Sequence, residues 1–190
     1  MFNKFSLLSI FLIPLTSLSV GSEQLKLATV DNGYYTSFVD CKTKLPLAVV
    51  YELSQDKGVA SRYSSYIDDE ELKRRNPDCH PNTDHQFKTF QSVLKSKGIK
   101  ASYDVGHIAM SNHLDMNDRS VKLANQWTNL APQSSNLNRN GGAWYEVELV
   151  TECQRELETI LVVAGVIDDP TTQDKDYFFD TFGQTTPDYF

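Results

Sequence analysis

The apolar segment 160–167, with the sequence ILVVAGVI, constrains the fold of this 190-residue chain more than any other feature. It is too short to cross a bilayer, because a spanning helix needs about 20 apolar residues. Continuous apolar runs of this kind, rich in Val and Ile, are typical of strands that are covered on both faces. We therefore expect residues 160–167 to form a buried central strand of a sheet.

Other segments place that strand in an α+β domain. Residues 34–39 and 47–53 are rich in strand-forming residues and flank a short polar turn, which predicts a β-hairpin. The apolar residues Val147, Val150, Leu157 and Ile160 recur at intervals that indicate a helix over 143–158. Further expected elements are a surface turn or short helix at 67–75, a helix at 87–97, a strand ending near Gly106 and another at 127–130.

The first 21 residues have the features of a secretory signal peptide. Lys4 precedes an apolar stretch over 5–20, and small residues at 19 and 21 suit cleavage before Ser22. A short membrane anchor or a buried helix is the alternative, but the stretch falls short of a bilayer span. We expect a secreted, extracellular protein with no membrane attachment after cleavage, in which residues 22–190 form one domain.

Secretion permits disulfide bonds, and the chain has three cysteines, Cys41, Cys79 and Cys153. They allow one bridge and leave one thiol, and the sequence does not choose the pair. One bridge leaves most of the stability of the domain to an apolar core. A structural zinc site of Cys79 with His80, His85 and His113 is a further reading, although their spacing matches no standard ligand pattern.

The net charge of -7 is unevenly distributed along the chain. Residues 141–190 carry 11 acidic and 2 basic side chains, whereas residues 22–140 carry 14 acidic and 15 basic ones. This balance excludes a protein that coats nucleic acid by bulk charge alone, but it permits a local basic groove. Lys88, Lys95, Lys97 and Lys100 form either a solvated helix face or a surface that attracts phosphate.

The residues that can carry chemistry lie between positions 103 and 155. His107 follows Gly106 at an expected strand end, and an imidazole with a pKa near ~6.5 can act as a general base at neutral pH. Asn138 and Glu148 offer a neutral and a charged oxygen. Mg²⁺ prefers oxygen ligands and keeps several waters, so one or two protein oxygens suffice to hold it.

Five short motifs follow one another in this part of the chain. They are Asp104-Val105-Gly106-His107, Asn129-Leu130-Ala131-Pro132-Gln133, Leu137-Asn138, Gly142-Ala143-Trp144 and Glu148. Their order and spacing resemble the ββα-metal (His-Me finger) family of DNA/RNA non-specific endonucleases, which includes endonuclease G. That family has Asp-Arg-Gly-His, Asn-x-x-Pro-Gln, Leu-Asn, Gly-x-Trp and a Glu. The resemblance extends less closely over residues 34–190, and it implies an antiparallel sheet flanked by helices with a ββα-metal finger.

Carried over residue by residue, the resemblance implies a role for each motif. His107 would deprotonate the attacking water, Asn138 would bind a single Mg²⁺ ion directly, and Glu148 would hold metal-bound waters; Mn²⁺ is a possible substitute. Asp104 would fix the local geometry. The side chains that would bind phosphate are those of Arg155, Arg139 and Arg62. The implied activity is hydrolysis of DNA and RNA through contacts to backbone phosphates, which carry no sequence information. Whether the protein has a protein partner is left open by the sequence.

The chain departs from the family pattern in three ways, and two of them, Val105 and the early C-terminus, motivate an alternative function. Val105 replaces the family arginine, and the lost charge-assisted contact, worth roughly 1.5–3 kcal/mol, should slow turnover unless Arg139 or Arg119 replaces it. Asn138 lies six residues before Trp144 where the family usually has four, which makes Asn140 the alternative ligand. The chain also stops at Phe190, so the domain is expected to be C-terminally shortened. The alternative is a secreted protein of the same fold that binds nucleic acid or a partner with weakened or no turnover.

Overall fold

The computed structural model describes residues 25–56, 58, 60–81, 92–169 and 184–190. Its larger sheet has four antiparallel strands in the order β1 (Leu27–Asp31), β2 (Thr36–Asp40), β3 (Pro46–Leu53) and β6 (Ile160–Gly165). A smaller antiparallel sheet pairs β4 (Tyr103–His107) with β5 (Leu130–Ser134). The fold is α+β, as predicted.

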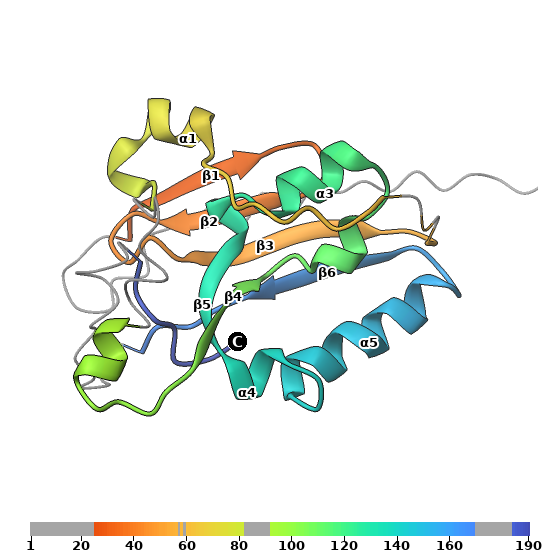
Figure 1. Ribbon diagram of the computed structural model, residues 1–190. Coiled ribbons are helices and arrows are strands. Elements are labelled where there is room, and N and C mark those ends of the chain that lie inside the picture. The colour runs from red at the N-terminus through yellow and green to blue at the C-terminus, as the bar shows by residue number, and fades with distance from the viewer. Residues whose placement is uncertain (1–24, 57, 59, 82–91, 170–183) are drawn as a thin grey trace, which may run out of the picture.

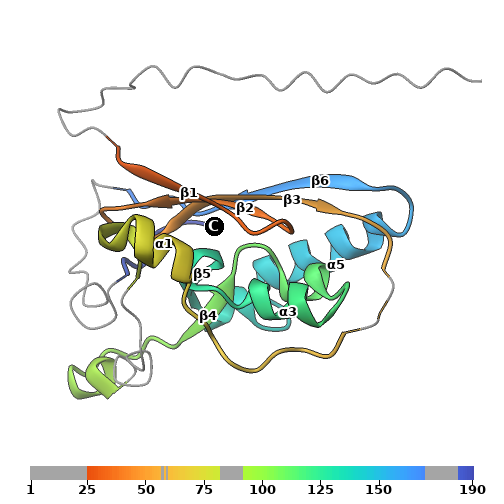
Figure 2. The same cartoon turned by 90° about the horizontal axis from the view of Figure 1, so that it is seen from above.

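The helices lie together on one side of the larger sheet. They are α1 (Glu70–Arg75), α3 (Asp118–Ala124), α4 (Ser135–Asn138) and α5 (Ala143–Arg155), with the 3₁₀ turns η1 (Pro77–Cys79), η2 (Ser111–Leu114) and η3 (Trp127–Asn129). In Figure 1 the β4–β5 pair crosses in front of the larger sheet. Seen from above, α1, α3, α5 and the β4–β5 pair all lie on the same side of that sheet (Figure 2). The core fills the space between these two layers.

The predicted hairpin is confirmed as β2 and β3. The carboxylate of Asp40 shapes its turn by accepting hydrogen bonds from the backbone N–H groups of Lys42 and Thr43 and from the hydroxyl of Thr43. Lys44 takes a positive φ of 63° in this turn. The side chains of β3 that face the helices are the buried residues Val49, Tyr51 and Leu53, which pack with residues such as Ile108, Leu114 and Ala131.

The prediction that residues 160–167 form a buried central strand is wrong in its position. β6 lies at the edge of the sheet and pairs only with β3 among the described strands. Leu161 and Val163 point away from the core and are 72% and 65% exposed, whereas Ile160 and Val162 pack against it. An apolar run without alternation does not distinguish an edge strand from a central one, and the second face of β6 carries no described helix.

Two further expectations need correction. Residues 127–129 form the turn η3, and the strand begins only at Leu130. Pro132 lies within β5, which tolerates it because this strand has a single hydrogen-bonded neighbour. The helix predicted over 143–158 is present as α5, but Val147, Val150 and Leu157 are 49%, 61% and 78% exposed. The helical spacing correctly identified residues that lie on one face of the helix. It did not show whether that face is buried against the rest of the protein or exposed to solvent.

The disulfide joins Cys41 to Cys79 and ties the end of β2 to η1, while Cys153 is a free, exposed thiol. This pairing removes Cys79 from any zinc site, and no group of three or more His, Cys, Asp or Glu residues in the described segments could hold a metal ion. A helix suited to crossing a membrane is likewise missing from the described segments. The expected signal peptide and residues 87–91 of the predicted helix 87–97 lie outside them; residues 92–96 are helical.

Candidate nuclease site

His107 ends β4 opposite Leu130 and is 8% exposed. Its Nε2 lies 3.3 Å from Oδ1 of Asn125, the residue that caps the C-terminus of α3. The amide of Asn125 is oriented by its own Nδ2, which donates to the carbonyl of Val121. Because Oδ1 can only accept, Nε2 of His107 carries the proton. The lone pair is therefore on Nδ1, which is the basic atom of this side chain.

The imidazole of His107 is held in its neutral form. Burial lowers its pKa to about 4; the bond to Asn125 opposes this shift and the charge of Arg62 adds to it. A histidine that is neutral and already hydrogen-bonded at Nε2 can accept a proton at Nδ1 at neutral pH.

The backbone on either side of His107 is fixed by tight packing. The Cα of Gly106 lies so close to Gln133 of β5 that an added Cβ would be 2.1 Å from Oε1 and 2.6 Å from Cβ of that residue. After the strand, Asn129 accepts from the N–H of Ala109 and donates to the carbonyls of Ala109 and Ala124. The glycine and the asparagine of the two motifs thus hold the His107 segment against β5 and α3.

Asp104, three residues before His107, connects β4 to α4. Its Oδ2 accepts from Nδ2 of Asn138 at 3.2 Å, and Arg139 donates to both of its oxygens, from Nε at 2.9 Å and Nη2 at 2.7 Å. Burial raises the pKa of Asp104, but the bonds from Arg139 and Asn138 outweigh it and the pKa is lowered. Since Nδ2 of Asn138 is engaged, its Oδ1 remains as the acceptor, and no described residue donates to it.

Glu148 lies in the middle of α5 and is half-buried. Burial raises its pKa to about 7, the charge of Arg62 lowers it, and the neighbouring Glu152 raises it. Arg62 is exposed and comes from the irregular segment before α1. Its charge acts on both Glu148 and His107, so the two side chains share the field of one cation. A desolvated carboxylate of raised pKa is a group that a bound divalent cation would stabilise.

Residues 15–190 match the family described as DNA/RNA non-specific endonuclease. The chain belongs to that family. A solved structure with a similar fold is a chain from the "Crystal structure of the EndoG/EndoGI complex: Mechanism of EndoG inhibition", with a TM-score of 0.60 and 18% sequence identity. The match covers 77% of the present chain and 56% of the other, so the chain spans little more than half the length of that protein. A comparison with curated protein sequences gave no match.

Arg155, one of the side chains predicted to bind phosphate, is buried in the structure. Arg155 is 1% exposed, and its guanidinium donates to the carbonyls of Ser54 at 2.8 Å and Asn112 at 3.1 Å. Asp56 and Asp115 lie 3.9 Å and 3.8 Å from its Nη2. All of these partners are internal, so in this structure the guanidinium attaches α5 to the body, and the contact of Arg155 with phosphate stays a prediction. The sequence carried no signal for this, because helical spacing put Arg155 on the face of Glu148 without showing how deep that face lies.

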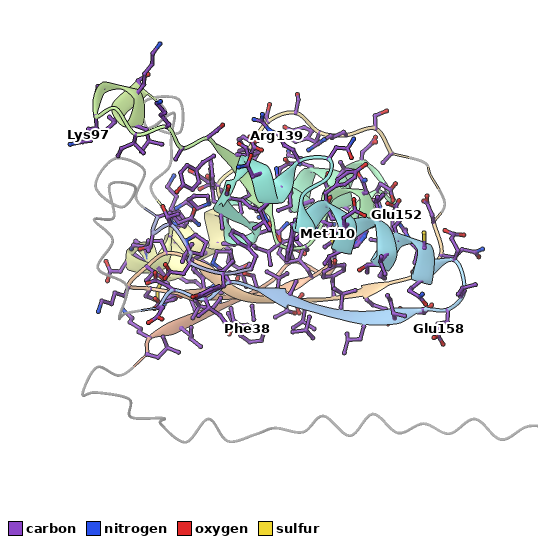
Figure 3. All side chains as sticks on the ribbon, turned by 90° about the horizontal axis from the view of Figure 1, so that it is seen from below. Phe38, Lys97, Met110, Arg139, Glu152 and Glu158 are labelled. Carbon is purple, nitrogen blue, oxygen red and sulfur yellow. A yellow bond between two sulfur atoms is a disulfide. The ribbon has the colours of Figure 1, made fainter. Side chains whose placement is uncertain are left out.

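The position of the missing family arginine is filled by apolar packing. Val105 is half-buried in a cluster with Leu94, Trp127 and Leu130. Of the two proposed replacements, Arg139 lies beside Asn138 through their shared partner Asp104, whereas Arg119 lines a separate pocket rich in acidic side chains on the α1 side of the fold. Arg139 and Glu152 are both found on the side of the molecule away from the larger sheet (Figure 3).

The other residues of the motifs differ in burial and in their contacts. Asn140 is exposed in the turn after α4, whereas Asn138 is bonded to the strand of His107. Trp144 is 7% exposed and packs edge-on against Phe190 with ring centroids 5.7 Å apart, as expected of a core residue. The partner of His107, Asn125, was missed because it belongs to none of the recognised motifs and only the folded chain brings it to the ring.

Proposed function

We propose that this chain is a secreted, divalent-metal-dependent endonuclease that hydrolyses internal phosphodiester bonds of DNA and RNA without sequence specificity. The observation that carries the proposal is that β4 holds both His107, with its basic Nδ1, and Asp104, which fixes the amide of Asn138 and the guanidinium of Arg139. A base, a cation and a metal-binding oxygen in one region are the groups that phosphodiester hydrolysis requires.

His107 acts as the general base. Its Nδ1 takes a proton from the attacking water, and the Nε2–H bond to Asn125 keeps the ring in the tautomer that leaves Nδ1 free for this step. The amide oxygen of Asn125 also stabilises the imidazolium that forms. Burial, with a smaller contribution from the charge of Arg62, disfavours the imidazolium, which keeps the resting histidine neutral and favours release of the proton afterwards.

The side chains of Asn138 and Glu148 fit a hard divalent cation, Mg²⁺ or in its place Mn²⁺. The fit rests on an amide oxygen with no donor among the described residues and a desolvated carboxylate of raised pKa. When bound, the ion supplies charge neutralisation at the scissile phosphate and at the leaving 3′-oxygen. Asp104 orients the amide of Asn138 by holding its Nδ2, and Arg139 locks Asp104 in place with two bonds.

Substrate binding is assigned to exposed cations around this region. Arg62 is exposed and free to contact a phosphate, and the side chain of Arg139 is 66% exposed despite its bonds to Asp104. Contacts of this type carry no base information, which agrees with cleavage of both DNA and RNA. Affinity that depends on phosphate contacts falls as salt rises, so the apparent KM for DNA should increase steeply with salt concentration.

A member of the same fold that binds nucleic acid without cutting it is the second candidate. It is favoured by one observation, the replacement of the motif arginine by Val105 in an apolar cluster. The two candidates differ in turnover. The purified domain 22–190 should nick supercoiled plasmid in Mg²⁺ and not in EDTA, and His107→Ala should reduce the rate by about 10²–10⁴-fold with unchanged circular dichroism. Binding without nicking in Mg²⁺ and Mn²⁺ would establish the second candidate.

Asn138 and Asn140 provide a matched pair of variants for the metal. Asn138→Ala should raise the Mg²⁺ concentration needed for half-maximal nicking, whereas Asn140→Ala, in an exposed turn, should leave it unchanged. The reverse result would assign the ligand to Asn140. Secretion is tested separately: expression of the full chain with its first 21 residues should release a product whose N-terminal sequence begins at Ser22.

A further inference from the structure

The helix that carries Glu148 is attached to the body of the protein by few apolar contacts. The buried residues of α5 are Trp144 near its start and Arg155 at its end. Between them, Val147, Leu149 and Val150 are 49%, 39% and 61% exposed. A helix normally takes its rotation from an apolar stripe against the core. The middle of α5, where Glu148 lies, has no such stripe.

His113, which the proposed reaction does not use, contacts α5 at this point. It belongs to η2 and is 1% exposed. Its Nε2 lies 3.4 Å from the carbonyl oxygen of Glu148, and its Nδ1 lies 2.8 Å from the hydroxyl of Tyr51 on β3. A carbonyl can only accept, so Nε2 carries the proton and Nδ1 accepts from Tyr51. Two hydrogen bonds with fixed donors and acceptors therefore connect Tyr51, on β3 of the larger sheet, through His113 to the backbone of Glu148.

The same 3₁₀ turn holds α5 at a second point. Arg155 donates to the carbonyl of Asn112, the neighbour of His113, and to the carbonyl of Ser54 just after β3. The two attachments, at positions 148 and 155, are two helical turns apart on one face of α5. Polar contacts from η2 therefore fix the rotation of the helix where apolar packing does not.

We propose that His113 is a positioning residue for the metal site: by bonding Tyr51 and the backbone of Glu148, it sets the direction in which the Glu148 carboxylate points. The inference rests on the proposed function, in which Glu148 helps to hold the cation. His113 contacts neither metal nor substrate. Outer partners of metal ligands typically contribute 10–100-fold to metal affinity, and this is the scale expected here.

Direct metal binding gives the test, with Mn²⁺ alone as the probe. The dissociation constant is measured by the electron paramagnetic resonance signal of free Mn²⁺, without DNA, for the folded domain 22–190. His113→Phe keeps the ring but removes both bonds, and it should weaken Mn²⁺ binding by about 10–100-fold. His113→Gln places an amide N–H where Nε2 stood and should recover most of the affinity. His80→Phe, at a buried histidine near α1 that does not touch α5, is the matched control and should leave the constant unchanged.

The outcomes separate this inference from the proposed function. If Glu148→Gln weakens Mn²⁺ binding while a folded His113→Phe does not, the positioning role is refuted and the nuclease proposal stands. If Glu148→Gln has no effect, the metal assignment itself fails. Equal losses in His113→Phe and His80→Phe would indicate general destabilisation and would also refute the role. Should His113→Phe fail to fold, Tyr51→Phe decides the question. It leaves His113 unanchored and should weaken Mn²⁺ binding, and an unchanged dissociation constant would overturn the inference.

Discussion

Replacing Arg155 by methionine separates a structural role from the phosphate contact expected for a helical arginine near Glu148. Methionine keeps much of the volume and removes the charge. The change leaves the carbonyls of Ser54 and Asn112 without their donor and takes the cation away from Asp56 and Asp115. Burial already raises the pKa of Asp115, and Asp56 adds to that shift while Arg155 opposes it. The variant therefore leaves a desolvated acid with a like charge as its neighbour.

The expected loss of stability follows from these contacts. Removing one partner of a buried ion pair typically costs about 3–5 kcal/mol. The two carboxylates keep 33% and 22% of their side-chain surface exposed, so water compensates part of the loss. We therefore take the lower end, about 3 kcal/mol. In a domain of this size each kcal/mol lowers Tm by about 2–4 °C, which gives a decrease of about 6–12 °C.

Differential scanning calorimetry of the metal-free protein measures this decrease, with Arg62→Met as the control. Arg62 is exposed, so its replacement should change the free energy of unfolding by no more than about 0.5 kcal/mol. It should instead raise the KM for DNA. The reasoning is refuted if Arg155→Met retains the wild-type Tm and loses DNA affinity in the way expected of Arg62→Met.

Three further predictions concern the strand pair, the disulfide and a buried histidine. Gly106→Ala should lower Tm by an amount corresponding to about 1–3 kcal/mol, because the new Cβ overlaps Gln133; an unchanged Tm would contradict the close packing of β4 on β5. Reducing Cys41–Cys79, which are 38 positions apart, should cost about 4 kcal/mol of unfolding free energy in urea titrations, and equal midpoints with and without reductant would argue against the bridge. Burial lowers the pKa of His80, so the unfolded chain binds its proton more readily. Its contribution to stability is complete above about pH 6.5 and is lost as pH falls toward the lowered pKa. His80→Phe should therefore lose less Tm between pH 7.5 and pH 5 than the wild type does, and equal losses would remove His80 as a cause.

The sequence predicted the elements whose signals are local. The hairpin of β2 and β3, the short helix α1, the end of β4 near Gly106 and the start of α5 at Ala143 all lie where propensity, turn residues and motifs placed them. β1 and α3 were not predicted. The strand expected at 127–130 is observed as β5 at Leu130–Ser134. Pro132 within it argues against a strand, although a strand at the edge of a sheet tolerates proline.

Burial was harder to predict than secondary structure. Leu161 and Val163 are apolar and exposed, and Arg155 is charged and buried; each depends on which layers cover an element, which no short segment encodes. The candidate site likewise contains residues that short motifs predict and residues that only the folded chain brings together. Motif order alone proposed four residues for the candidate site, Asp104, His107, Asn138 and Glu148. Asn125 was not among them, because its distance from His107 in the chain hides a contact that only α3 and β4 together create.

The separation of the β4–β5 pair from the larger sheet has a consequence for how this protein loses activity. Within the described part of the chain, neither strand hydrogen-bonds to any of the other four, and an isolated two-stranded ribbon is marginal in water. The ribbon is held to the body by side-chain clamps such as Asn129, by the small cluster around Trp127 and by Ala131, the residue of β5 that reaches the main core. We therefore expect warming to open the ribbon and disrupt the candidate site while the four-stranded sheet is intact. Inactivation would then precede global melting, and the working temperature of the protein would be set by its smallest sheet.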